Sequence, residues 1–305
     1  MRRWFQILKD TGNEWYEDQV PRLAASLAFY TLLSMAPLSI LCVSIVGFFY
    51  GEDAARGEIA GQLAQVIGPE AAGAVQGIIF NAHQSSSGLI STIIGVALLL
   101  VGASGAFTEL QSALNAMWGV KPKPGRGLLG FLHDRFLSFT MVLGVAFMLL
   151  VQLILSAALA AVSGVLSKSL PGGEWLWQGL NFALSFVTVT VLFALIFKVV
   201  PDAQIRWRDV AVGAAVTALL FSFGKLLLGL YLGKSTVASP YGAAGSLVAF
   251  VLWVYYASQI LFLGAEFTQV YTRHLGKAIR PSANAVSILP RPTTASTLQR
   301  PQAQT

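Results

Sequence analysis

The sequence contains few charged residues. Only 11% of its 305 residues are Asp, Glu, Lys or Arg, whereas 55% are hydrophobic. Soluble domains carry about 25% charged residues, which cover the surface that faces water. This shortage excludes an ordinary water-soluble protein and indicates that most of the surface faces lipid.

Residues that bind metals or form disulfides are also scarce. The single cysteine, Cys42, excludes an internal disulfide. The three histidines, His83, His133 and His274, show no ligand spacing such as His-x-His or His-x-x-x-His. The phosphate-binding pattern Gly-x-x-x-x-Gly-Lys-Ser/Thr is absent as well. We therefore expect no metal, no other cofactor and no catalytic residue, and we expect that the protein is not an enzyme.

Long apolar stretches take up most of the chain. A helix needs roughly 20 apolar residues to cross a bilayer. Stretches of this length lie at about residues 23–50, 89–110, 136–166, 176–200, 210–232 and 241–271. The sequence therefore predicts an all-α, polytopic membrane protein with six transmembrane helices, in a membrane domain that covers residues 21–275.

The remaining segments differ from these spans in composition. Residues 1–20 mix aromatic and charged residues, which predicts a helix lying in the membrane interface. Residues 51–88 keep helical apolar spacing on both sides of Gly68-Pro69, which predicts an external amphipathic helical hairpin. Residues 276–305 are rich in Pro, Ala, Ser, Thr and Gln, which predicts a disordered cytoplasmic tail.

Basic residues fall mainly on one side of this topology. Of the 20 Lys and Arg residues, 16 lie in the N-terminal segment, the second and fourth connections and the C-terminal segment. Because basic loops stay on the cytoplasmic side, both termini should be cytoplasmic. The net charge of +6 is then a topology signal. We expect no nucleic-acid partner, because no basic patch contains aromatic or polar residues that could contact bases.

Charged and polar side chains inside or beside apolar spans are candidate functional residues, because burying them in lipid is costly. Lys225 lies in the fifth span, where a functional role and snorkelling to the interface are both open. Glu266 lies near the cytoplasmic end of the sixth span, on the order of 15 Å away from Lys225 in depth, so we expect no direct pair.

Other candidates lie near the level of Glu266. They are Glu109, Asn115, Arg135 and Asp209. Together with Lys225 and Glu266, they make up the candidate set for a transport pathway or a lipid-headgroup site. Such a ring of carboxylates and arginines could gate a pathway or bind an anionic headgroup. It could equally form structural ion pairs that tie helix ends together.

The segment SPYGAAGS precedes the sixth span. Ser239 suits a helix N-cap and Pro240 suits the first helical position. Tyr241, Gly242 and Gly245 follow, and small residues at such a position allow neighbouring helices to approach closely. The segment therefore predicts a tightly packed helix start at the external mouth, and secondarily an anion or headgroup site.

Several motifs together carry a resemblance to a known family. They are AASLAFYTLLSMAP at residues 24–37, GASGAFTELQSALN at 102–115 with Trp118-Gly119, LHDR at 132–135, Pro201-Asp202 with WRD at 207–209, and YGAAGS at 241–246 leading through LWVYY to GAEF at 264–267. In this order they resemble the YihY/BrkB family of bacterial inner-membrane proteins, over about residues 20–275.

The resemblance implies a location in the bacterial inner membrane. Some members of the family carry a virulence-factor label, and an old family label is ribonuclease BN. A metal-dependent nuclease needs clustered His, Asp and Glu to hold ions and activate water, and the sequence contains no such cluster. We therefore do not expect ribonuclease activity.

Three functions remain open. The first is a transporter or permease for a small solute or lipid, and the second is a lipid-handling protein that passes phospholipids to periplasmic partners. The third is a scaffold or assembly factor without transport of its own. The expected partners are the lipid bilayer, a phospholipid or small-solute cargo, and a periplasmic protein or a second copy of the chain.

Overall fold

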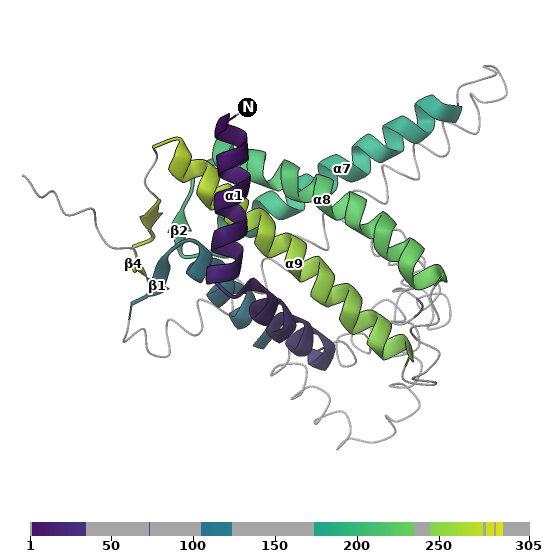
Figure 1. Cartoon of the computed structure of the whole chain (residues 1–305), viewed down its shortest axis with the longest axis horizontal. Helices are drawn as coiled ribbons and strands as arrows, with labels where there is room; N and C mark the ends of the chain where they lie inside the picture. The colour runs from purple at the N-terminus through teal and green to yellow at the C-terminus, as the bar shows by residue number, and fades with distance from the viewer. Residues whose placement is uncertain are drawn as a thin grey trace, which may run out of the picture.

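The computed structural model describes residues 2–34, 73, 105–123, 174–234, 245–276, 279–283 and 285–288, which are mostly helical (Figure 1). The long helices are α1 (Arg2–Glu17), α7 (Glu174–Val199), α8 (Trp207–Lys234) and α9 (Gly245–His274). Two further helical segments run through residues 20–34 and 105–117. The predominantly helical architecture expected from the sequence is therefore present in the described part of the chain.

Three described helices are long and apolar enough to cross a membrane. The qualifying segments are Phe182–Val199 in α7, Trp207–Leu227 in α8 and Leu247–His274 in α9. These segments overlap the last three predicted spans. α9 continues three residues beyond the predicted end of its span at residue 271.

Other predicted elements lie wholly or largely outside the described residues. The predicted span at 136–166 is among them, and so is the external hairpin at 51–88 apart from Gly73. Only the first part of the span at 23–50 and the last part of the span at 89–110 are described, and both parts are helical. The number of six spans therefore stays a prediction.

Small residues bring α8 and α9 into close contact. Gly213 of α8 faces Thr268 of α9, and Gly264 of α9 faces Thr217 of α8. A Cβ on either glycine would overlap the facing threonine, so only glycine permits this approach of the two backbones. Each threonine hydroxyl donates to the glycine carbonyl one turn earlier, at 2.7 Å in α8 and 2.6 Å in α9. We call these two reciprocal contacts the Gly–Thr crossing.

Aromatic rings join α7 to α8, and α8 to α9. The ring of Phe193 in α7 meets that of Phe221 in α8 edge-on, with centroids 5.6 Å apart. Phe221 in turn meets Trp253 of α9 at 6.2 Å, again edge-on. Such edge-to-face pairs contribute about 0.5–1.5 kcal/mol beyond the burial of their area. Helices α7, α8 and α9 thus form one packed unit.

Four short strands lie at one end of this unit. Antiparallel pairing joins β1 (Val120–Pro122) to β4 (Ala285–Ser287), and β2 (Ala203–Gln204) to β3 (Arg280–Pro281). In register, Lys121 lies opposite Val286, and Ala203 lies opposite Pro281. We call these strands, with the turn between α7 and α8, the strand end of the molecule.

The sequence predicted a disordered tail from residue 276 onward, whereas the structure has strands β3 and β4 in this segment. Gly119 and Gly276 follow the helices that precede β1 and β3, with φ of 62° and 70°. Glycine adopts this left-handed conformation without a steric penalty, so it ends each helix and turns the chain toward its strand. The backbone amides then find partners far away in sequence, which the polar composition of residues 276–288 did not indicate.

The Gly–Thr crossing yields a test of the helix packing. Gly213→Ala adds a methyl group that overlaps Thr268, so we expect a loss of about 1–3 kcal/mol in stability, as for other overpacked sites. Thermal unfolding of the purified protein in detergent measures this loss as a lower Tm.

The matched control is Gly12→Ala in α1, where nothing lies within 4 Å of an added Cβ. We expect this control to leave the Tm unchanged or to raise it slightly, because alanine favours a helix over glycine. Equal Tm values for Gly213→Ala and the wild type would contradict the close contact.

Candidate functional site at the junction of α1 and α9

Acidic residues recur every four positions at the start of the chain. Asp10, Glu14 and Asp18 have the spacing that places side chains on one face of a helix, although Asp18 itself lies in the turn after α1. α9 ends with Arg273 and His274, where basic residues complement the partial negative charge of a helix C-terminus. The two sets of opposite charge face each other at the junction of α1 and α9.

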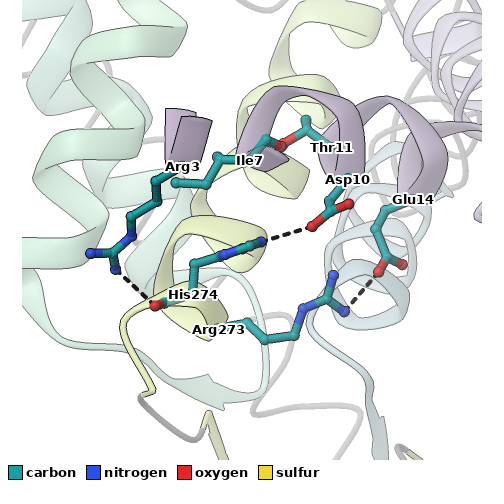
Figure 2. A network of polar contacts seen from close by, with 7 residues as sticks. All are labelled: Arg3, Ile7, Asp10, Thr11, Glu14, Arg273 and His274. Atoms are coloured by element: carbon teal, nitrogen blue, oxygen red, sulfur yellow. Dashed lines mark hydrogen bonds and ion pairs between the residues drawn. The ribbon is translucent and has the colours of Figure 1, made fainter. Parts of the chain in front are cut away.

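Polar pairs join the two helices at the outer part of this junction. Figure 2 shows Arg3, Asp10 and Glu14 of α1 pointing toward Arg273 and His274. The Arg273 Nη1 atom lies 2.7 Å from Glu14 Oε1, and His274 Nε2 lies 2.8 Å from Asp10 Oδ2. Arg3 Nη2 donates to the His274 carbonyl at 2.8 Å. Because these groups are partly exposed, each pair contributes at most about 1 kcal/mol, and their main effect is to fix the position of α1.

Apolar contacts stabilise the same junction. Ile7 is buried against Phe267 and Val270 of α9. The ring of Trp4 stacks on Tyr271, with centroids 6.1 Å apart. α1 is therefore docked on the last turns of α9 by burial as well as by charge.

A second polar contact reaches further along α9. Trp15 Nε1 donates to Gln259 Oε1 at 3.2 Å, and Gln259 Nε2 donates to the Tyr255 hydroxyl at 2.8 Å. Gln259 lies two turns before Glu266, on the same side of α9. The C-terminal end of α1 therefore lies against the inner part of an apolar helix.

Glu266 is the most deeply buried acidic residue of the junction. Its side chain is 1% exposed, and it lies within the candidate span Leu247–His274. It forms a hydrogen bond with Asp18. Two carboxyl groups can share a hydrogen bond only when one of them carries a proton. Within the described part of the chain, Glu266 Oε1 and Gln269 Oε1 are buried without a hydrogen-bond partner.

A sharp turn brings Asp18 to Glu266. α1 ends at Glu17, and Gln19 has φ of 52°, which is uncommon for a residue other than glycine. The Gln19 carbonyl accepts hydrogen bonds from the amides of Arg22 and Leu23, so Gln19 starts the next helix. The position of Asp18 is therefore fixed by the backbone on both sides.

Burial raises the pKa of the Asp18 carboxyl above its ordinary value of 3.8. The hydrogen bond with Glu266 opposes this shift, whereas the charges of Glu14 and Glu17 add to it. A hydrogen bond lowers the pKa of a carboxyl when that group accepts it in its charged form. Because burial is the largest of these effects, the net shift of the Asp18 pKa is upward.

The structure places two of the sequence candidates at the strand end instead. Asn115 is buried, with its Nδ2 atom 3.1 Å from Asp202 Oδ2 and its Oδ1 atom 2.7 Å from the Asp202 amide. Asp209 is buried in the first turn of α8, where a carboxylate complements the helix dipole. Asn115 thus holds the turn between α7 and α8 in place, which is a structural role.

None of the described candidates is among the charged groups that act on Glu266. In the part of the chain that the structure describes, those groups are Asp18, Glu14 and Arg273, which the sequence did not predict. Glu109 and Lys225 are half-buried on the helical segment 105–117 and on α8. The candidates Arg135, Ser239, Pro240, Tyr241 and Gly242 lie outside the described residues, and Gly245 is the first residue of α9.

A signal for the missed residues was present in the sequence. The four-residue repeat of Asp10, Glu14 and Asp18 marks an acidic face, and Arg273 lies seven residues after Glu266, on the same side of α9. Among the described residues, no group of three or more His, Cys, Asp and Glu side chains is arranged to hold a metal ion. The chemistry that the junction offers is therefore proton sharing and charge pairing.

Comparison with known proteins finds membrane proteins over most of the chain. The family described as virulence factor BrkB matches residues 12–288. A UPF0761 membrane protein of Rhodospirillum centenum is 31% identical over 252 residues, which cover 81% of this chain and 53% of the relative. UPF0761 membrane proteins of Kangiella koreensis and Azoarcus sp. are each 27% identical, covering 86% of this chain and 63% and 62% of their own lengths.

The chain spans between half and two-thirds of the length of these curated relatives. No solved structure matches it. The matched range contains all the motifs that suggested the resemblance to the YihY/BrkB family. The names of the family and of these relatives state no enzymatic activity.

The raised pKa of Asp18 predicts a pH dependence of stability. A carboxyl whose pKa is higher in the folded state stabilises the fold below its ordinary pKa, here 3.8, and this contribution is lost as the pH rises through the raised value. We expect the Tm of the wild type to fall relative to that of Asp18→Asn as the pH is raised from about 4 to about 8.

Asn13→Ala is the control for this series, since it changes an exposed position of α1 that is not among the groups acting on Asp18. The Tm of this control should follow the pH in the same way as that of the wild type. A difference between the wild type and Asp18→Asn that is constant over the whole pH range would contradict the raised pKa.

Asn115 allows a separate prediction at the strand end. Asn115→Ala leaves the half-buried amide of Asp202 without its side-chain acceptor, which costs about 1–3 kcal/mol. We expect a lower Tm and faster proteolysis of the turn between α7 and α8. Asn13→Ala, at an exposed position of α1, should leave both measurements at wild-type values.

Proposed function

We propose a transport function for this chain, which belongs to the virulence factor BrkB family of membrane proteins. This membership confirms the resemblance suggested by the sequence motifs. In the proposal the protein is a transporter or permease for a small solute or a lipid, and it is not an enzyme. The observation that carries the proposal is the burial of Glu266 in α9.

A carboxyl group inside an apolar helix needs a reason to be there. Burying an ionisable side chain in a membrane costs several kcal/mol, so such residues are rare and usually mark substrate or ion pathways. Glu266 is 1% exposed and shares a hydrogen bond with Asp18, and its Oε1 atom has no hydrogen-bond partner among the described residues. An acceptor with spare capacity suits a site where a proton, a cation or a cargo donor binds and leaves.

The direction of the protein in the membrane follows from its basic residues. We propose that α1 and the strand end are cytoplasmic, in a bacterial inner membrane, because the segments that form them are rich in Lys and Arg. Arg3, Lys9 and Arg273 are exposed at this end, as the rule requires. Glu266 then lies in the cytoplasmic half of its span.

The proposed partners are the bilayer, a cargo and a protein on the external side. The bilayer surrounds the apolar helices, and the cargo is a phospholipid or a small solute. A periplasmic protein or a second copy of the chain would contact the external side, whose predicted hairpin at 51–88 lies largely outside the described residues. Nucleic acid is not a partner in this proposal.

Glu266→Gln tests the proposal directly. The substitution keeps the size and the hydrogen-bonding capacity of the side chain but removes its titratable proton. In vesicles reconstituted with the purified protein, we expect Glu266→Gln to lower the initial rate of cargo movement at least tenfold. The cargo is found first, by comparing solute uptake and lipid composition between wild-type vesicles and empty vesicles.

Glu17→Gln is the matched control, because it makes the same chemical change at an exposed position. It should transport at the wild-type rate. Wild-type transport by Glu266→Gln would contradict the role of this carboxyl, and no cargo movement in wild-type vesicles would contradict the transport function.

The second candidate function is that of a scaffold or assembly factor for envelope lipid transport. The close Gly–Thr crossing favours it, since this contact holds α8 and α9 together without space between their backbones. In that case Glu266 and Asp18 tie α1 to the bundle, and Glu266→Gln lowers the stability of the protein without affecting any transport.

A further inference from the structure

α1 carries an apolar surface that the described part of the chain leaves uncovered. Phe5 is 71% exposed, Leu8 62% and Tyr16 78%. At about 100° per residue these three side chains lie on one side of the helix, with Gly12 between them. We call this surface the outer face of α1. Among the described residues, no side chain lies within 4 Å of a Cβ added at Gly12.

The opposite side of α1 is the one that contacts the protein. Ile7 and Thr11 are buried there, and Asp10 and Glu14 pair with His274 and Arg273. The buried side is thus partly acidic, whereas the outer face is aromatic and aliphatic. An ordinary surface helix buries its apolar side and exposes its polar side, whereas α1 exposes a second apolar side in addition to the one it buries.

A third side of the helix is polar and open. Gln6, Asn13 and Glu17 are exposed and lie about a third of a turn away from the outer face. α1 therefore has one side for the protein, one for an apolar environment and one for water. A helix lying in a membrane interface has these surroundings.

The position of α1 supports the same environment. The first half of α1 packs on the last turns of α9, at the end of the candidate span Leu247–His274, and Trp15 reaches back to Gln259. That end is where a bilayer surface would meet the helix bundle. Figure 1 shows α1 crossing α9 obliquely at this level instead of running along it.

The charge beside the outer face favours contact with an anionic membrane surface. Asp10 and Glu14 are used on the buried side, and Asp18 is used by Glu266. Lys9 is exposed and lies next to Phe5 on the helix surface. A lysine beside aromatic residues can hold its ammonium group at the level of lipid phosphates while its stem covers the apolar surface.

We propose that the outer face of α1 inserts into the headgroup region of the leaflet that meets the end of α9, and that it prefers anionic phospholipid. The buried side meanwhile holds the last turns of α9 through Arg273 and His274. This inference does not depend on the transport function, because it concerns where α1 lies and not what the protein moves.

Spin labels at single cysteines test the proposal in the full-length protein. Cys42 is first replaced by Ser, and a label is then attached at Leu8→Cys on the outer face or at Gln6→Cys on the polar side. Both positions are exposed, so the labels should not disturb the fold. Each protein is placed in nanodiscs made of phosphatidylcholine alone or mixed with phosphatidylglycerol.

The measurement is the collision of the label with oxygen, which concentrates in lipid, and with a water-soluble nickel chelate. We expect the label at residue 8 to collide more with oxygen than with the chelate, by at least fivefold relative to the label at residue 6. We also expect this ratio to rise by at least twofold when phosphatidylglycerol is present, and to lose that rise in Lys9→Gln.

Each contrary result overturns a defined part of the proposal. Equal access of the chelate to residues 6 and 8 would show that the outer face lies in water. Protection of residue 8 from both reagents would show that a protein surface, such as a second copy of the chain, covers it. The same ratio in both kinds of nanodisc would overturn the preference for anionic lipid.

Discussion

The two contacts of the Gly–Thr crossing determine which side of α9 faces each neighbour. Gly264 and Thr268 lie on the side of α9 that packs against α8, where a Cβ on Gly264 would overlap Thr217. Glu266 lies two residues from each of them, which is a rotation of about 200° around a helix. The close approach to α8 therefore turns Glu266 away from α8 and toward α1. Without Gly213 and Gly264, α9 could not approach α8 this closely while Glu266 faces α1.

The register of α1 depends in turn on that rotation. Once Glu266 and Arg273 face α1, an acidic residue every four positions along the chain can meet them and His274. The left-handed turn at Gln19 then directs the chain into the next helix while Asp18 remains at Glu266. Local charge spacing, a single unusual backbone conformation and a helix contact some distance away thus combine at one junction. No single one of these three features would be enough to bring Asp18 to Glu266.

Sequence reasoning predicted the parts of the fold that depend on composition and on the spacing of apolar residues. The three apolar segments in α7, α8 and α9 were found because a span is long and its apolar character is continuous. Glu266 was found because a charge inside such a segment is conspicuous. Asp18 was missed because its burial depends on how α1 docks. The four-residue spacing of Asp10, Glu14 and Asp18 marks an acidic face but does not show what that face contacts. β3 and β4 were missed because their pairing with β2 and β1 joins segments about 80 and 165 residues apart, which local composition does not record.

The two proposals meet at α1. Its outer face is assigned to the bilayer surface, and its end leads directly into Asp18, which shares a hydrogen bond with Glu266. If lipid binding holds α1 on α9, it favours the arrangement in which the two carboxyl groups meet. By linkage, the protonation that joins them must then favour the lipid-bound position of α1 by the same free energy. The carboxyl pair at the end of α1 therefore couples lipid binding by the outer face of α1 to protonation inside the helix bundle.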